Sequence, residues 1–116
     1  MNAKTVSCGR KLILSISVLG MVLVMGSPAR ADERGESLFK GKCAMCHGPD
    51  GAGKTMIGEK LKIPDLHSAD VQKKSDGDLK AIIAKGKDKM PAYDGKLSKE
   101  QIDGVVSFIR NLPKKH

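Results

Sequence analysis

The 116-residue chain is predicted to be all-α, and three observations lead to that prediction. Apolar residues recur at helical spacing in the C-terminal half, in two segments that each begin at a serine capping box. β-branched runs are scarce once the apolar stretch near the N-terminus is set aside. The sequence contains no repeat, low-complexity segment or sign of a second domain, so one small helical domain is expected.

The N-terminus has the pattern of a secretory signal peptide. A basic segment precedes an uncharged apolar run over residues 12–25, which is shorter than the ~20 residues of a membrane span. Ala29-Arg30-Ala31 is typical of a signal-peptidase site, so cleavage is expected before Asp32. The chain thus divides into a signal peptide, residues 1–31, and a mature domain, residues 32–116. An uncleaved N-terminal anchor is the alternative.

The first part of the mature domain is expected to hold one helix and one long loop. Residues 32–42 are predicted to form the helix, with Leu38 and Phe39 on its apolar side. Residues 48–64 are rich in glycine, proline and lysine, and this composition favours mainly loop.

Two further helices are expected in the second part. One opens with the capping box of Ser75 and Asp78 and stops near Gly86, and the other opens with the capping box of Ser98 and Gln101. Their predicted apolar faces are Leu79, Ile82 and Ile83 in the first, and Ile102, Val105, Val106, Ile109 and Leu112 in the second, where Leu97 can pack against Ile102.

The motif Cys43-Ala44-Met45-Cys46-His47 has the spacing used for covalent attachment of haem. Each thiol can add to one porphyrin vinyl group, and the histidine then supplies an axial imidazole to the iron. A thioredoxin-like redox site needs a βαβ context that this sequence lacks, and a zinc site needs two further ligands at suitable spacing. A disulfide would not need His47. The motif therefore predicts one covalently bound haem c.

Met90, in the loop between the two later helices, is predicted to be the second axial ligand of the iron. Its thioether would favour the ferrous state, and Pro91 would stiffen the loop that holds it. Packing in the core is the alternative role for a methionine. His67 is the main rival as ligand, and Met56 is a weaker one.

Composition limits the functions that remain. The leader holds four basic residues and no acidic one, so the net charge falls from +8 for the whole chain to +4 for residues 32–116. The three aromatic residues are not interleaved with lysines, so nucleic-acid binding is not expected. A domain of this size has a thin core, and a bound haem would supply an apolar plate for its helices.

With these motifs, residues 32–116 resemble a class I c-type cytochrome of the small bacterial monohaem kind. The resemblance rests on the haem motif followed by Met90-Pro91, with Gly35, Phe39, Pro64-Asp65-Leu66 and Phe108 in support. It implies that the first and last helices cross at Gly35, with Phe39 and Phe108 packed there. It also implies that the Pro64 carbonyl orients His47. Tryptophan, which many relatives use near the haem propionates, is absent, and Tyr93 and the lysines are candidates instead.

The expected function is that of an exported, monomeric periplasmic electron carrier that transfers one electron through the exposed haem edge. Its partners would be redox proteins with acidic docking surfaces. Peripheral contact with membrane electron-transfer complexes is also expected to be possible. No small-molecule substrate is expected. Alternatives are a dedicated haem subunit of a periplasmic oxidoreductase complex, or an open-site haem enzyme or gas sensor. The lysines expected around the haem edge are Lys40, Lys42, Lys54, Lys85, Lys87, Lys89 and Lys96, interrupted by Asp88 and Asp94.

Overall fold

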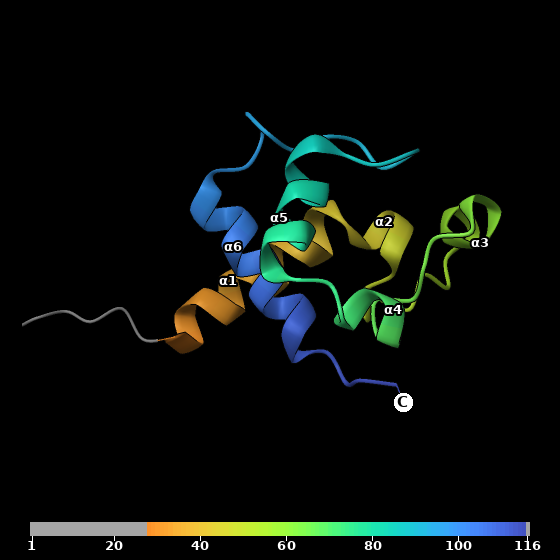
Figure 1. Ribbon diagram of the computed structural model, residues 1–116, viewed down its shortest axis with the longest axis horizontal. Helices are drawn as coiled ribbons and strands as arrows, with labels where there is room; N and C mark the ends of the chain where they lie inside the picture. The colour runs from red at the N-terminus through yellow and green to blue at the C-terminus, as the bar shows by residue number, and fades with distance from the viewer. Residues whose placement is uncertain (1–27, 116) are drawn as a thin grey trace, which may run out of the picture.

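A computed structural model describes residues 28–115, which form helices and no extended strand (Figure 1). The all-α prediction is confirmed. Residues 1–27 of the predicted signal peptide lie outside the described part, and no described helix is long and apolar enough to cross a membrane. The helices are α1 (Pro28–Lys42), α2 (Ala44–His47), α3 (Met56–Leu61), α4 (Ala69–Gln72), α5 (Asp76–Lys85) and α6 (Lys99–Asn111).

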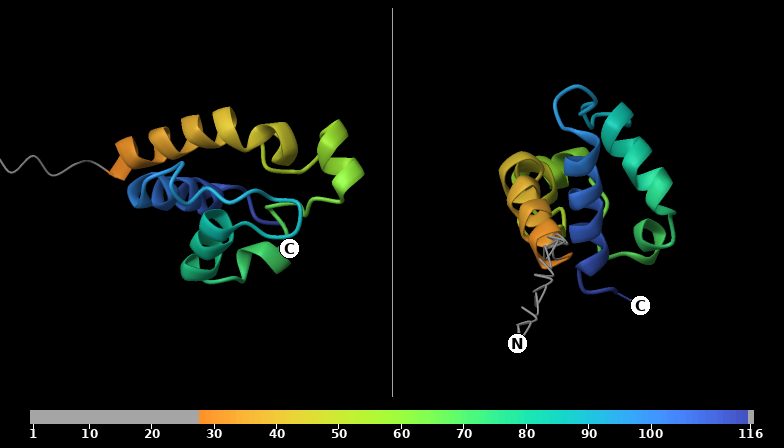
Figure 2. Two further views of the ribbon diagram at one scale, coloured as in Figure 1. Left: turned by 90° about the horizontal axis from the view of Figure 1, so that it is seen from above. Right: turned by 90° about the vertical axis from the view of Figure 1, so that its left-hand side faces the viewer.

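Three helices make the body of the domain, with α6 between α1 and α5 (Figure 2). The largest fully buried side chains are Phe39 in α1 and Val105 and Val106 in α6. Phe108 packs on Phe39 with ring centroids 5.0 Å apart. The predicted packing of these two aromatic rings between the first and last helices is therefore present.

Gly35 allows α1 and α6 to approach each other closely. A Cβ on Gly35 would lie 1.9 Å from the carbonyl oxygen of Gly104 in α6. A backbone oxygen cannot turn away as a side chain can, so the two helices would have to separate.

Gly35→Ala is accordingly expected to destabilise the domain by about 3 kcal/mol, the upper end for overpacking a core. Denaturant unfolding of the holoprotein measures this change. Gly41→Ala is the matched control, because Gly41 lies in the same helix with no atom within 4 Å of its would-be Cβ. Alanine should stabilise that site slightly. Equal effects of the two variants would rule out the close crossing.

The later helices begin and end as their side-chain signals predict. Ser75 with Asp78 and Ser98 with Gln101 form reciprocal capping boxes at α5 and α6. Gly86, with φ of 76°, is the C-cap of α5. The predicted apolar faces are buried, apart from Ile82, which is half-buried. The first helix differs, because α1 begins at Pro28 rather than Asp32.

Two short helices, α3 and α4, were not predicted, and α3 falls within the segment expected to be mainly loop. Thr55 is the N-cap of α3 and accepts a hydrogen bond from the Gly58 N–H. Within α3 only Gly58 is buried, and α4 has four residues with only Val71 buried. Neither helix therefore carries the apolar stripe that reveals longer helices.

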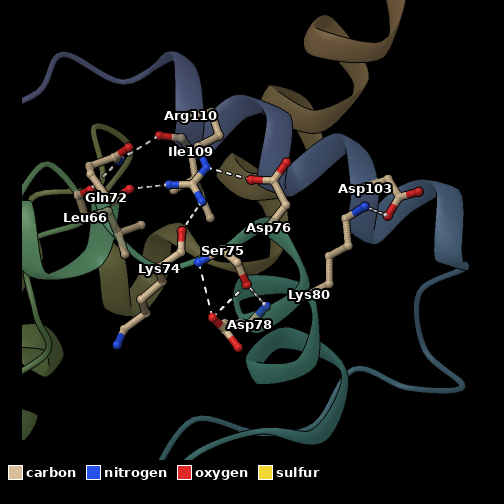
Figure 3. A network of polar contacts seen from close by, with 10 residues as sticks. All are labelled: Leu66, Gln72, Lys74, Ser75, Asp76, Asp78, Lys80, Asp103, Ile109 and Arg110. Atoms are coloured by element: carbon tan, nitrogen blue, oxygen red, sulfur yellow. Dashed lines mark hydrogen bonds and ion pairs between the residues drawn. The ribbon is translucent and has the colours of Figure 1, made fainter.

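A polar network fastens the link between α4 and α5 to α6 (Figure 3). The Arg110 guanidinium donates to the Asp76 carboxylate at 2.8 Å, to the Gln72 carbonyl at 2.7 Å and to the Lys74 carbonyl. The Gln72 amide in turn donates to the Ile109 carbonyl at 3.1 Å. The link is thereby held against α6, which fixes the start of α5 and, through it, the loop that follows.

Candidate haem site

Cys43, Cys46 and His47 lie together on one short turn. Helix α1 ends at Lys42, and the amides of Cys46 and His47 both donate to the Cys43 carbonyl, at 3.2 and 2.9 Å. Both cysteines are half-buried free thiols, so no disulfide joins them. The predicted attachment residues are thus close together and chemically available.

Burial favours the protonation states of Cys43 and His47 that haem chemistry uses. Burial, followed by the charge of Cys46, raises the pKa of Cys43 to about 11, so its thiol keeps its proton at neutral pH. Burial lowers the pKa of His47, which favours the neutral imidazole that ligates metals. A protonated thiol adds across a vinyl group with new S–C and C–H bonds, and the addition needs no oxidant.

The His47 ring is held by packing. It lies beside Phe39, with ring centroids 6.2 Å apart, and its Nδ1 is buried without a hydrogen-bond partner. The hydrogen bond expected between this atom and the Pro64 carbonyl oxygen is therefore absent. Buried polar atoms normally have a bonding partner, so an unpartnered imidazole nitrogen suggests that a bound group belongs next to this ring. With two free thiols on the same turn, the residues present fit a covalently attached haem.

The loop after His47 folds back onto the motif. The Gly53 amide donates to the His47 carbonyl at 2.6 Å, and the Thr55 hydroxyl donates to the Cys46 carbonyl at 2.9 Å. A Cβ on Gly58 would lie 2.5 Å from that same Cys46 oxygen. The free carbonyls at the end of α2 are thus satisfied, and the motif is held in one conformation.

Met90 lies in a tight turn after α5. Its amide donates to the Lys87 carbonyl at 2.8 Å, its carbonyl accepts from the Lys87 amide at 3.2 Å, and Asp88 between them has φ of 53°. The Met90 side chain is half-buried and packs against the core. Three residues on, the Tyr93 hydroxyl donates to the carbonyl of Lys42, next to Cys43, at 3.1 Å. The structure therefore brings the Met90 loop to the haem motif.

The rival ligands are in other environments. Both ring nitrogens of buried His67 lie 2.6 Å from backbone carbonyl oxygens, those of Pro113 and Asp50. The weaker rival Met56 is 88% exposed, and Met45, which lies within the motif and is not a rival, is 75% exposed. Tyr93, the candidate partner of the propionates, has its hydroxyl on the Lys42 carbonyl instead.

The lysines predicted around the site are exposed. Lys40 pairs with Glu36 at 2.6 Å, and the Lys96 ammonium lies 5.9 Å from the centre of the Tyr93 ring. Lys87 and Lys89 are in the Met90 turn itself. The turn that carries the methionine therefore has two lysines, with Asp88 between them.

Comparison with known proteins identifies the family of this arrangement. Residues 30–109 match the family model described as cytochrome C oxidase, cbb3-type, subunit III. Cytochrome c6 of a Nostoc species is 35% identical over 107 residues, which cover 85% of this chain and 91% of the relative. Cytochrome c6 of Bryopsis maxima is 42% identical over 82 residues, 66% of this chain and 86% of the relative. The solved KustC0563 c-type cytochrome superposes with a TM-score of 0.64 at 32% identity, over 69% of this chain and 98% of that one.

Proposed function

The chain belongs to the class I c-type cytochromes, electron-transfer proteins with a covalently bound haem c, and we propose that it is a periplasmic carrier with Cys43, Cys46, His47 and Met90 as its haem residues. In this proposal the two cysteines form the thioether bonds, and His47 and Met90 are the axial ligands of the iron. The observation that carries it is the hydrogen bond from Tyr93 to Lys42, which joins the Met90 loop to the residue before Cys43.

The environments of the other candidates support Met90 as the sixth ligand. His67 would have to give up a carbonyl partner and leave a buried position before it could bind iron. Met45 and Met56 point largely into solvent, whereas Met90 is half-buried against the core. A half-buried thioether in a loop that Tyr93 ties to Lys42 is the candidate that these contacts favour.

The residues of this chain would then act by holding the haem and by keeping other molecules away from its iron. When bound, haem c supplies a one-electron couple, and axial methionine raises its potential relative to bis-histidine ligation. Cys43 and Cys46 would fix the porphyrin to the end of α1, and neutral His47 and Met90 would hold its iron. Two protein ligands would disfavour binding of a substrate at the iron, and the chemistry proposed is therefore outer-sphere electron transfer.

A second candidate is a dedicated haem subunit of an oxidoreductase complex, because the matching family model is described as an oxidase subunit. The two functions differ in whether the protein is free or bound to a larger redox complex. A free carrier should elute as a monomer from gentle periplasmic extracts, whereas a subunit should copurify with a larger redox complex in fixed ratio.

Mass spectrometry of the protein from the periplasmic fraction tests the assignment. One haem should remain attached after denaturation, on the peptide that contains Cys43 and Cys46, and the chain should begin at Asp32. Thiol-specific alkylation should label neither cysteine. Free, alkylated Cys43 and Cys46 without added haem mass would refute the attachment, and an intact residue 1 would indicate an uncleaved leader.

The docking surface proposed for acidic partners is the group of exposed lysines around the Met90 turn, namely Lys85, Lys87, Lys89 and Lys96. Ferrocyanide serves as an anionic probe, and its electron-transfer rate with the protein should fall as salt rises, since screening acts beyond ~8 Å at 0.15 M. The Lys87→Glu/Lys89→Glu variant should slow this reaction severalfold with an unchanged absorption spectrum. Lys73 and Lys74 lie before the opposite end of α5, so their double reversal is the control. A rate independent of salt would instead indicate an apolar docking surface.

A further inference from the structure

Tyr93 is fixed at its backbone and at its side chain. Its amide donates to the Ile83 carbonyl in the last turn of α5 at 3.0 Å. Its carbonyl accepts from the amides of Lys96 and Leu97, both at 2.9 Å. Its hydroxyl reaches 51 residues back along the chain and donates to the Lys42 carbonyl at 3.1 Å. The backbone bonds tie Tyr93 to α5, and the hydroxyl ties it to α1.

The carbonyl that accepts this hydrogen bond lies where α1 breaks. An uninterrupted helix would send the Cys46 amide to Lys42, four residues earlier, but that amide bonds to Cys43. The Lys42 carbonyl therefore has no helical partner, and the Tyr93 hydroxyl supplies one. The contact sits at the junction between the helix and the haem motif.

We propose that Tyr93 is a positioning residue for the sixth iron ligand, whose hydroxyl keeps the Met90 loop closed against the haem motif. The inference rests on the proposed ligation by Met90. Because Tyr93 follows Met90 by three residues, its bond to Lys42, the residue before the motif, limits how far the thioether can move away. Among residues 28–115, the hydrogen bonds of Met90 are those of its turn with Lys87, and its side chain is held by packing.

The hydroxyl is suited to remain a donor. Burial raises the pKa of Tyr93 above its ordinary value, so the phenol keeps its proton at neutral and moderately alkaline pH. The ring meanwhile packs against the core. Tyr93→Phe keeps this ring packing and deletes the hydrogen bond alone.

The test measures how readily an added ligand replaces the thioether. Imidazole binds the ferric holoprotein only when the loop opens, so its apparent affinity is proportional to the open fraction. Loss of one hydrogen bond should raise the affinity of Tyr93→Phe for imidazole about fivefold. The near-infrared charge-transfer band of sulfur-ligated ferric haem should persist without imidazole, because Met90 still ligates in the closed state.

Ser107→Ala is the matched control. Ser107 donates a hydrogen bond to the Asp32 carboxylate, which joins α6 to α1 away from the Met90 loop. This variant should lose stability but bind imidazole like the parent protein. Equal gains in imidazole affinity for Tyr93→Phe and Ser107→Ala would mean general loosening and would overturn the positioning role. An unchanged affinity in Tyr93→Phe would also overturn it.

Met90→Ala separates this inference from the ligation on which it depends. If Met90 is the ligand, Met90→Ala lacks the near-infrared band and binds imidazole far more tightly than Tyr93→Phe. A Met90→Ala protein that matches the parent in both measurements would refute the ligation, and the positioning role with it. A Tyr93→Phe protein that matches the parent while Met90→Ala does not would refute the positioning role alone.

Discussion

The Cys43→Ala/Cys46→Ala variant should be largely unfolded, with most of the helical circular dichroism of the holoprotein lost. The described domain is small, and its largest fully buried side chains are only Phe39, Val105 and Val106. A core of this size supplies on the order of 3–5 kcal/mol, little more than one or two point mutations remove. Without the thioether bonds proposed for these cysteines, haem c would no longer be retained.

Met45→Ala is the control for this variant. Met45 lies between the two cysteines and is 75% exposed, so its truncation changes the same turn without touching attachment or core. It should retain haem and unfold at nearly the parent's denaturant midpoint. A double cysteine variant with a cooperative, haem-free native fold would contradict the expectation, and would mean that the helices alone suffice.

Met90→Ala should leave the fold intact and change the iron. In the proposed ligation, loss of the thioether removes the ligand that favours the ferrous state, so the reduction potential should fall by roughly 100 mV or more, within the ~0.8 V range that axial ligands span. The near-infrared band should disappear, and small ligands such as imidazole should bind at the vacated position. Potentiometry and absorption spectroscopy measure these changes.

Two control variants identify the ligand. Met56→Ala truncates a methionine that is 88% exposed and should change neither the potential nor the spectrum. His67→Ala removes the bonds to Asp50 and Pro113, so it should lower stability and leave the near-infrared band in place. If His67→Ala opens the iron and Met90→Ala does not, the sixth ligand is His67.

Helix ends with side-chain signals were predictable from the sequence. The structure contains the capping boxes at Ser75 and Ser98 and the glycine stop at Gly86. A capping box depends on two residues three positions apart, and a glycine stop depends on one backbone angle, so both kinds of signal are local in the sequence. The haem motif was recognisable for the same reason, since its chemistry is local. The sequence also placed Phe39 and Phe108 together, although through family resemblance rather than pattern.

Contacts to backbone carbonyls could not be predicted in this way. Arg110 binds the carbonyls of Gln72 and Lys74, and Tyr93 binds that of Lys42. Every residue has a carbonyl, so the acceptor leaves no mark in the sequence, and only the fold selects it. His67 illustrates the same point, because two carbonyls engage a ring that resembled an iron ligand in the sequence.

The glycine crossing of α1 and α6 also determines when the domain can fold. Gly35 and Gly104 are far apart in the chain, and closing a loop of about 70 residues costs about 4 kcal/mol of chain entropy. Cys43 and Cys46 lie between these two glycines, so both cysteines are on an open loop until the crossing forms. An open loop leaves both thiols accessible, which favours haem attachment before helix crossing.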